Sequence, residues 1–377
     1  MTMLKIGIVV GTRPEAIKMA PIALEIGRAR GMKPLLILTA QHRSMCDEVL
    51  EVFDLKPDYD LDIMKPNQSL FEVVARLSRK MERVLAKEQP DIVLVQGDTT
   101  STFMGSLCSY FMKIPVGHVE AGLRTGRKYS PFPEEINRKL TSAIADLHFA
   151  PTAVARDALL AEGVPRKRIF VVGNPVIDAL LDVASRDYPF RNKKIAAVDF
   201  ARNRVIAVTA HRRESWGKPF AAMMRALKQI VQKHEDVVVV FPVHFNPNVR
   251  KTVRKVLKGV DRVVLVDPLD YTEFVKLLKC CHLIITDSGG IQEEAPSLGK
   301  PVLLMREVTE RPEAVKAGAV RVVGTDTRRI VSACSRLLDS KREYDKMIVR
   351  RNPYGDGKAA RKIVRIIRDN IRRMERA

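Results

Sequence analysis

Features that assign many chains to common protein classes are missing from these 377 residues. The five cysteines form no CxxC pair and no metal-ligand spacing, so we expect reduced thiols and no metal site. No apolar run approaches the roughly 20 residues that span a bilayer. The first residues, Met1 to Lys5, run directly into a strand-like segment and lack the anatomy of a signal peptide. These absences predict a cytoplasmic protein with no membrane span.

The common phosphate-binding motifs are missing as well. No GxGxxG sequence follows the first strand-like segment, where Gly11-Thr12-Arg13-Pro14 stands instead, and no GxxxxGK[ST] sequence occurs. The chain therefore lacks the fingerprints of a dinucleotide-dependent redox enzyme and of a P-loop kinase. We expect no nicotinamide and no other cofactor.

Acidic residues are scarce relative to basic ones. The 44 Asp and Glu residues against 65 Lys and Arg residues give a formal net charge of +21, a field that attracts anions. The excess is densest from Gly357 to Ala377, where Ile363, Ile367 and Ile371 share one helical face. Neither aromatic interleaving nor a nucleic-acid motif accompanies it. We interpret the segment as a docked amphipathic helix and expect no specific nucleic-acid partner.

Short apolar segments alternate with helical patterns along the chain. Strands are predicted at 4–10, 33–39, 91–96 and 115–120, and the pattern restarts at 205–209. Such alternation indicates an α/β fold with doubly wound parallel sheets. With a joint near Gly173-Asn174-Pro175, we predict two Rossmann-like domains, residues 1–173 and 174–356. A cleft between two such domains is a common ligand site.

The segment from Asp287 to Glu294 points to a nucleotide. It follows an apolar strand-like run, and its turn at Ser288-Gly289-Gly290 opens a helix that Pro296 is expected to shorten or kink. Such a turn presents free N–H groups to an anion. We predict a nucleotide diphosphate there, with Glu294 in reach of the ribose. An ordinary glycine-containing strand–helix turn explains the segment equally well.

Acidic residues recur at predicted strand ends and helix starts of the first domain. Asp98, Glu120 and Glu134 are expected to lie close together, and clustered carboxylates raise one another's pKa, which suits proton transfer near neutral pH. Taken singly, Asp98 is also compatible with a helix N-cap and Glu134 with a first-turn helix acid.

Basic groups complete the predicted site. His211, followed by two arginines, ends the first strand of the second domain and is predicted to contact a phosphate or leaving group. Arg13 and Lys18 are candidates for the same task from the first domain, and His42 and His244 are weaker candidates.

A series of motifs, in order along nearly the whole chain, resembles the non-hydrolysing UDP-N-acetylglucosamine 2-epimerases. The resemblance implies a glycosyltransferase-B-type architecture with an interdomain cleft, a homodimer, and a C-terminal helix at about 357–377 that packs back on the first domain. The motifs are GTRPEAIK at 11–18, QHR at 41–43, GDTT at 97–100, HVEAGLRTG at 118–126, PFPEE at 131–135, GNPVID at 173–178, HRRE at 211–214, DSGGIQEE at 287–294 and TERPE at 309–313.

The resemblance also implies roles for individual residues. Asp98, Glu120 and Glu134 match the catalytic carboxylates of the family, and Lys18 and His211 match supporting catalytic positions. Two further sets follow from the same matching. UDP would be held by Arg13, His211, Phe274, Ser288, Gly289, Gly290, Glu294 and Arg311, and a second, allosteric substrate site would use Gln41, His42, Arg43, Glu135 and His244.

The reaction implied by the resemblance is reversible C2 epimerisation of UDP-N-acetylglucosamine to UDP-N-acetylmannosamine. UDP leaves C1 while C2 loses its proton, and UDP re-adds to the bound 2-acetamidoglucal. Alternatives remain open: a 2-epimerase of a modified UDP-sugar, such as a 2,3-diacetamido sugar or its uronic acid; a hydrolysing epimerase; a glycosyltransferase of the same architecture; or a non-catalytic nucleotide-sugar or nucleic-acid binder. The residues alone do not assign which carboxylate acts as the base in each direction.

Overall fold

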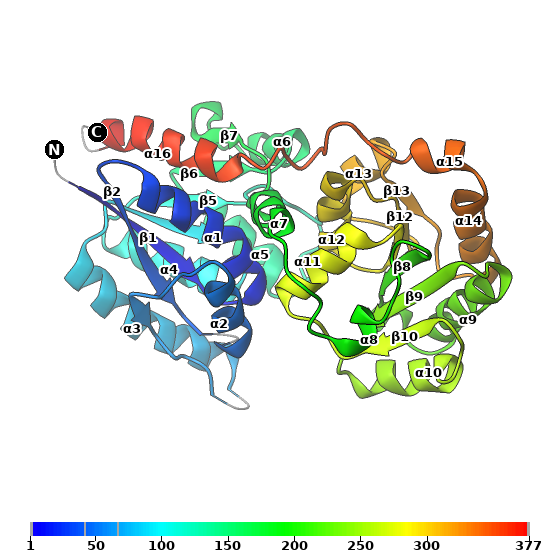
Figure 1. Cartoon of the computed structure of the whole chain (residues 1–377). Helices are drawn as coiled ribbons and strands as arrows, with labels where there is room; N and C mark the ends of the chain where they lie inside the picture. The colour runs from blue at the N-terminus through cyan, green and yellow to red at the C-terminus, as the bar shows by residue number, and fades with distance from the viewer. Residues whose placement is uncertain (1–2, 41–42, 66–67, 375–377) are drawn as a thin grey trace. The chain divides into compact units, whose positions relative to one another are not determined.

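The computed structural model describes residues 3–40, 43–65 and 68–374, and the chain divides into two compact units (Figure 1). Unit 1 consists of Met1–Ala179 and Tyr354–Ala377, and unit 2 of Leu180–Pro353. The first division falls inside helix α7 (Pro175–Ser185), a few residues beyond the joint considered from the sequence.

Unit 1 is built on a seven-stranded parallel sheet with the order β3-β2-β1-β4-β5-β6-β7. The order reverses between β1 and β4, and the carboxyl ends of strands at such a switch point form the usual ligand crevice of this kind of sheet. The strands are β1 (Leu4–Val10), β2 (Met32–Leu38), β3 (Tyr59–Asp60), β4 (Ile92–Gln96), β5 (Val116–Val119), β6 (Leu147–Ala150) and β7 (Ile169–Val171).

The helices of unit 1 form two groups. Helices α3, α4 and α5 pack side by side, while α1 packs against α2 and α16. In α3 the N-cap Ser69 and Glu72 form a capping box, and Val73, Leu77, Met81 and Val84 make a buried stripe at helical spacing. The helices are α1 (Arg13–Arg28), α2 (Arg43–Val52), α3 (Leu70–Glu88), α4 (Thr100–Phe111), α5 (Glu134–Ile144), α6 (Ala153–Ala161), η1 (Arg166–Arg168), α7 and α16 (Ala359–Met374).

Unit 2 repeats this design with a six-stranded parallel sheet of order β10-β9-β8-β11-β12-β13. Its switch point lies between β8 and β11, where Thr209 and Thr286 stand in register. The predicted α/β class with two Rossmann-like parallel sheets is thereby confirmed. The strands are β8 (Arg204–Thr209), β9 (Val237–Pro242), β10 (Val263–Val266), β11 (Leu283–Thr286), β12 (Val302–Leu304) and β13 (Val320–Val322).

The helices of unit 2 complete the alternation. Helix α12 ends at Glu294, and a 3-10 turn containing Pro296 follows it, so the helix is short as its proline predicts. The helices are α8 (Lys193–Ala196), η2 (Arg213–Ser215), α9 (Lys218–Lys233), α10 (Pro247–Leu257), α11 (Tyr271–Cys280), α12 (Gly289–Glu294), η3 (Ala295–Leu298), α13 (Pro312–Lys316), α14 (Thr327–Asp339) and α15 (Lys341–Asp345).

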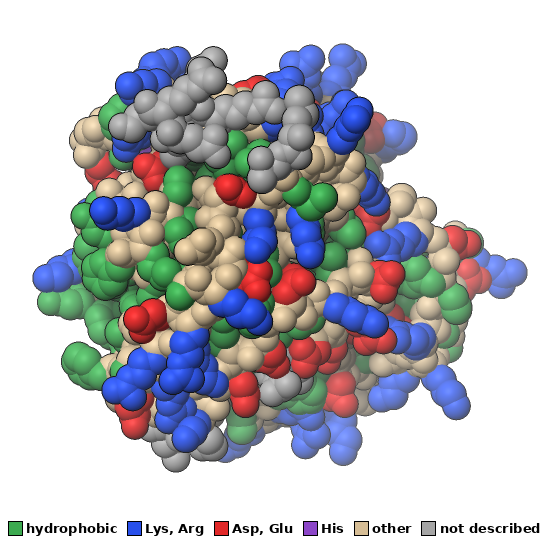
Figure 2. Space-filling view, turned by 90° about the vertical axis from the view of Figure 1, so that its left-hand side faces the viewer, with side chains coloured by type: hydrophobic (Ala, Val, Ile, Leu, Met, Phe, Trp, Pro, Cys, Tyr) green, Lys and Arg blue, Asp and Glu red, His purple; other side chains and the backbone are tan. Residues whose placement is uncertain are grey.

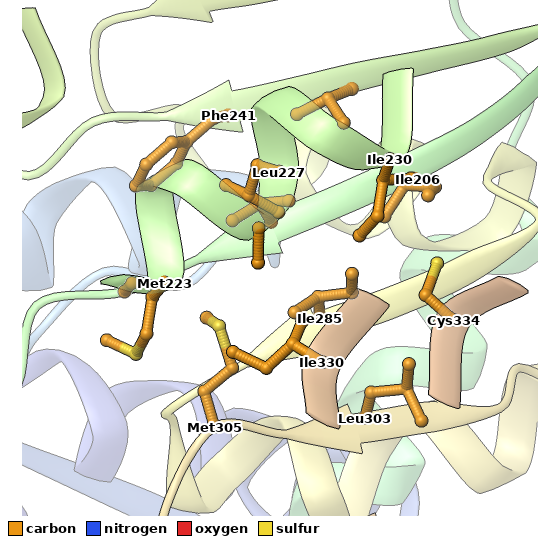
Figure 3. Packing of buried hydrophobic residues seen from close by; sticks show 14 of the residues in the cluster. Ile206, Met223, Leu227, Ile230, Phe241, Ile285, Leu303, Met305, Ile330 and Cys334 are labelled. Carbon is orange, nitrogen blue, oxygen red and sulfur yellow. The ribbon is translucent and has the colours of Figure 1, made fainter. Parts of the chain in front are cut away.

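A continuous hydrophobic core supports the unit 2 sheet (Figure 3). Side chains of β8, β9, β11 and β12 pack against the buried faces of α9 and α14, which contact each other. Burying each such side chain contributes roughly 1.5–3 kcal/mol. The residues labelled in the figure are Ile206, Met223, Leu227, Ile230, Phe241, Ile285, Leu303, Met305, Ile330 and Cys334.

The last helix belongs to unit 1 although unit 2 separates it from the rest of that unit in sequence. Helix α16 packs along α1, and Ile363, Val364, Ile367 and Ile371 are buried. The Asp178 carboxylate of α7 accepts the backbone N–H groups of Ala359 (3.2 Å) and Ala360 (2.9 Å) and so holds the start of α16.

The surface carries basic side chains widely. Lys and Arg side chains are spread over the face drawn in Figure 2 and are interspersed with Asp and Glu. Within the described part of the chain, no helix has both the length and the apolar character needed to cross a membrane.

Candidate functional site

Glu120 is a firmly held carboxylate at the carboxyl ends of the unit 1 strands. It directly follows β5, has a left-handed φ of 62° and is only 7% exposed. Lys18 Nζ donates to both carboxylate oxygens (2.6 and 2.7 Å), Asn174 donates to Oε1 (2.8 Å), and the Gln96 side chain donates to Oε2. A strained backbone that holds a buried, multiply bonded carboxylate is typical of a functional site.

Asp98 lies in the electrostatic field of Glu120. Burial raises the pKa of Asp98, an effect that its ion pair with Arg138 opposes and that Glu120 reinforces. Helix α5 also fixes the Asp98 backbone, because the Asn137 side chain donates to its carbonyl oxygen (3.0 Å). The interpretation of Asp98 as a helix N-cap is wrong, since Thr99 caps α4 through its hydroxyl group.

Glu134 is the first residue of α5 and is partly buried. As a first-turn acid it suits the helix dipole. In the described part of the chain, no hydrogen bond or ion pair joins it to Asp98 or Glu120. The structure therefore brings Asp98 and Glu120 together, and it connects Glu134 to them only through the helix that supplies Asn137 and Arg138.

Helix α1 carries the two basic residues predicted for unit 1. Arg13 is its first residue, and Lys18 forms the ion pair with Glu120. The turn before this helix is tightly packed, because a Cβ atom at Gly11 would come within 2.5 Å of the Thr39 hydroxyl oxygen. Only glycine fits there, so the close approach fixes where α1 begins.

Glu15 is a buried acid whose role the sequence did not suggest, although Thr12 and Glu15 have the spacing of a capping box. Its Oε2 accepts the backbone N–H groups of Gly11 (2.8 Å) and Thr12 (2.7 Å). Its Oε1 accepts the hydroxyl groups of Thr99 (2.6 Å) and Thr102 (2.9 Å). Glu15 thus ties the turn after β1, which leads to Arg13, to the turn after β4, which carries Asp98.

Two neutral histidines stand in register on β5 and β6. Burial lowers the pKa of His118 to about 3 and that of His148 to about 4. His118 Nε2–H donates to the carbonyl oxygen of Gly97 (2.8 Å), the residue before Asp98. At neutral pH the uncharged His118 ring therefore supports the Asp98 turn, and it has no need of a counter-charge.

In unit 2 the corresponding tie is made by Asp287, which is fully buried directly after β11. Its Oδ2 accepts the backbone N–H groups of His211 (2.7 Å) and Arg212 (2.8 Å), the residues that follow β8. The His211 ring lies with Nδ1 3.5 Å from Asp287 Oδ1 and stacks on His244, with ring centroids 5.4 Å apart. The turn at the switch point thus presents imidazole and guanidinium groups.

A chain of polar contacts continues from the Ser288 turn. The Gln292 side-chain N–H donates to the backbone carbonyl oxygen of Ser288 (3.0 Å), and the Gln292 side-chain oxygen Oε1 accepts the Thr309 hydroxyl group (2.6 Å). Arg311 forms an ion pair with the buried Glu293. This network joins the two motifs 287–294 and 309–313, which are separate in the sequence.

The other residues predicted to hold UDP lie on two helices. Gly289, Gly290 and Glu294 are in α12, and Phe274 is partly buried on α11. A Cβ atom at Gly289 would lie 3.6 Å from Arg212 Nη2, so the start of α12 lies beside a guanidinium group.

The residues predicted for an allosteric site are only partly described. Gln41 and His42 lie outside the described residues, and Arg43 is the first residue of α2. Glu135 is buried in unit 1 and accepts the backbone N–H groups of Thr125 (3.1 Å) and Gly126 (3.1 Å). His244 lies in unit 2, where it stacks on His211.

A metal centre has no support in the described ranges, where no group of three or more His, Cys, Asp or Glu side chains is placed to hold an ion. The arrangement instead offers carboxylates for proton transfer in unit 1 and cationic or N–H groups for an anion in unit 2.

Comparison with known proteins gives consistent similarities. A family model described as UDP-N-acetylglucosamine 2-epimerase matches residues 24–368. The UDP-N-acetylglucosamine 2-epimerases of Yersinia pestis and Escherichia coli K12 are each 50% identical, and each match covers 97% of this chain and 99% of the relative. The crystal structure of the Neisseria meningitidis UDP-GlcNAc 2-epimerase, bound to UDP-GlcNAc, superimposes with a TM-score of 0.89 at 46% identity, over 97% of this chain and 100% of that one.

Proposed function

This chain belongs to the UDP-N-acetylglucosamine 2-epimerase family, a family of isomerases, and from that premise we propose that it interconverts UDP-N-acetylglucosamine and UDP-N-acetylmannosamine. The observation that carries the proposal is the buried Glu120 carboxylate, bonded by Lys18, Gln96 and Asn174, with Asp98 in its field. A glycosyltransferase has no need for this pair of neighbouring acids, of which Glu120 is buried and Asp98 partly buried.

The proposed reaction proceeds by elimination and re-addition. A carboxylate takes the C2 proton, the electron pair of that bond forms the C1–C2 double bond, and the C1–O bond breaks with its electrons leaving on UDP. The bound intermediate is 2-acetamidoglucal. In the second step a carboxylic acid returns a proton to the opposite face of C2, and a UDP oxygen adds to C1. No external oxidant, reductant or metal is needed for the balance.

Asp98, Glu120 and Glu134 are the proposed acid–base groups, and Lys18 is a proposed supporting group. Burial raises the pKa of Asp98, which favours a carboxyl group that holds a proton at higher pH than usual. Lys18 fixes and neutralises Glu120. Positioned acid–base groups of this kind typically contribute about 10²–10⁴-fold to the rate.

Unit 2 is proposed to retain UDP through both steps. His211, the backbone of Ser288, Gly289 and Gly290, and Arg311 would contact the diphosphate, with Arg13 contributing from unit 1. Glu294 would bind the ribose, and the backbone at Phe274 would frame the uracil. Stabilising the charge that develops on departing UDP is commonly the largest single contribution to such a step.

Turnover in deuterated water tests this function. With UDP-N-acetylglucosamine as substrate, we expect UDP-N-acetylmannosamine to form with deuterium at C2, followed by NMR. Free sugar released at every turnover would instead indicate a hydrolysing epimerase. Turnover only of a 2,3-diacetamido substrate or its uronic acid would move the assignment to a modified UDP-sugar, and turnover only with an acceptor would indicate a glycosyltransferase.

The proposal includes a cytoplasmic homodimer. Tyr110 and Phe111 at the end of α4 and Leu140 on the adjoining α5 are exposed, and large exposed apolar side chains on neighbouring helices suit a protein–protein contact. Sedimentation of the intact chain measures the mass, and a monomer at micromolar concentration would contradict this part.

A further inference from the structure

An arginine-lined cavity lies at the open edge of the unit 2 sheet, where β13 is the last strand (Figure 1). The cavity has a volume of about 450 Å³. Arg321 reaches it from β13, and Arg328, Arg329 and Arg336 reach it from α14. Among the described residues that line the cavity there is no acidic side chain, and none is a residue of the candidate site above.

The floor of the cavity is apolar. Val322, Val323 and Ala333 line it, with the Ser332 hydroxyl group beside them. A volume of this size lies in the range of small-molecule sites, and the cavity is open to solvent, with Arg328, Arg329 and Arg336 exposed along it. The lining therefore predicts a compact ligand with both charged and less polar parts.

The four arginines are not used to hold the fold together by ion pairs. Among the described residues none of the four has an ion pair, whereas Arg204 pairs with Asp236 in the same unit. The pKa of Glu343 is lowered first by its bond with Lys346, and to a smaller extent by Arg321 and Arg336. Glu343, the carboxylate on which these two arginines act, is thus already bonded to Lys346.

Two of the arginines also oppose the electrostatics of their helix. Arg328 and Arg329 are in the first turn of α14, which contains no acidic residue and is capped by Asp326. Positive charges at a helix N-terminus are unfavourable because they face the positive end of the helix dipole. Positions that break a local stability rule without a compensating contact are commonly retained for binding.

From these observations we propose that the cavity binds a small molecule carrying two phosphate groups. Guanidinium forks match phosphate oxygens in pairs, and several of them around one cavity neutralise a diphosphate that a single arginine does not. The apolar floor accommodates the organic part of such a ligand. The site is separate from the proposed substrate site, since the two share no residue.

Titration calorimetry with inorganic pyrophosphate at physiological ionic strength tests the proposal. We expect the wild type to bind one pyrophosphate per chain. The double variant Arg328→Gln/Arg336→Gln should lower the affinity for pyrophosphate by at least about tenfold, because two charge-assisted bonds are lost. The matched control is Arg225→Gln/Arg254→Gln, which removes the same charge from exposed positions on α9 and α10 of the same unit. This control should bind as the wild type does.

A second pair of variants separates a built site from a general positive field. Arg328→Lys/Arg336→Lys keeps the charge but loses the forks, so it should also weaken binding. The proposal would be overturned if the control variant lost as much affinity for pyrophosphate as the glutamine variant, or if the lysine variant bound pyrophosphate as tightly as the wild type. Absence of pyrophosphate binding by the wild type would overturn it as well. Loss of single-stranded oligonucleotide binding in the same variants, without pyrophosphate binding, would assign the cavity to nucleic acid instead.

Folding and turnover provide the remaining controls. The midpoint of thermal unfolding of Arg328→Gln/Arg336→Gln should stay close to that of the wild type, because an unfavourable charge in the first turn of α14 and a favourable charge in its last turn are removed together. Turnover of UDP-N-acetylglucosamine without pyrophosphate should be unchanged in this variant. A loss of turnover would mean that the cavity is not separate from the substrate site, and failure of the proposed epimerase activity itself would leave the pyrophosphate result standing.

Discussion

The two units share one strand order but present opposite chemistry where their central strands end. In unit 1 the residues after β4 and β5 are carboxylates: Asp98, paired with Arg138, and Glu120, held by lysine and amide donors. In unit 2 the residues after β8 are His211 and two arginines. One fold therefore supports either a proton-transfer site or an anion site, depending on the side chains at the switch point.

The units also share a device that makes this difference possible. In each, one buried acid accepts two backbone N–H groups of the turn after the first strand: Glu15 for Gly11 and Thr12, and Asp287 for His211 and Arg212. Rossmann-type domains commonly use such N–H groups for a ligand phosphate. Here an internal carboxylate occupies that role, which leaves the neighbouring side chains to define the chemistry.

The largest effect is expected from the proton-transfer side. Asp98→Asn should lower the turnover of UDP-N-acetylglucosamine by at least about 10²-fold, because an amide cannot exchange the proton. Its affinity for UDP, measured by calorimetry, should stay within about twofold of the wild-type value, because UDP is proposed to bind mainly to unit 2. The control is Asp157→Asn, an exposed acid of α6, which should turn over normally. Wild-type activity of Asp98→Asn would remove Asp98 from the mechanism.

Exchanging Glu15 and Asp287, the acids that hold the two turns, for amides tests the comparison between the units. Each change leaves a backbone N–H without its charged acceptor, which costs on the order of 1–3 kcal/mol, or about ten- to a hundredfold. Glu15→Gln should appear mainly as a lower kcat, and Asp287→Asn mainly as weaker UDP binding. The steady-state split between kcat and KM, together with UDP calorimetry, distinguishes these outcomes. If both variants lost only kcat, or both lost only UDP affinity, the proposed assignment of proton transfer to unit 1 and UDP binding to unit 2 would be wrong.

The smallest effect concerns the pH dependence of stability in unit 1. Burial raises the pKa of Asp178 to about 6, above the ordinary value of roughly 3.9 for an unfolded chain. Between these values the folded chain holds the extra proton, so this group makes the free energy of unfolding fall as pH rises from about 4 to about 6, with no further change above.

Asp178→Asn should remove that part of the slope, on the order of 3 kcal/mol across the window. Chemical denaturation at several pH values between about 4 and 7 measures it. Asp182→Asn changes a half-exposed acid of the same helix and should keep the wild-type slope. An unchanged slope in Asp178→Asn would show that the buried carboxyl group is not responsible.

Sequence reasoning predicted the strands because buried parallel strands are continuous apolar runs, and the motifs at their ends were visible in the printed chain. It missed what depends on distant pairing. The acceptor role of Asp287 requires that β8 and β11 be neighbours, and the Arg138 contact with Asp98 requires that α5 lie against the β4 turn. Thr99 took the capping role considered for Asp98, since either residue suits a cap and only geometry decides between them.

The return of α16 to unit 1 has a consequence for the order of assembly during synthesis. Unit 2 is one continuous stretch, so all of its strands are available once residue 353 has left the ribosome. Unit 1 has its sheet much earlier, but the side of α1 that packs against α16 stays uncovered until Ile363, Ile367 and Ile371 emerge. The first unit to begin folding is therefore the last to finish, and a chain stalled before residue 354 would display an unfilled hydrophobic surface to chaperones.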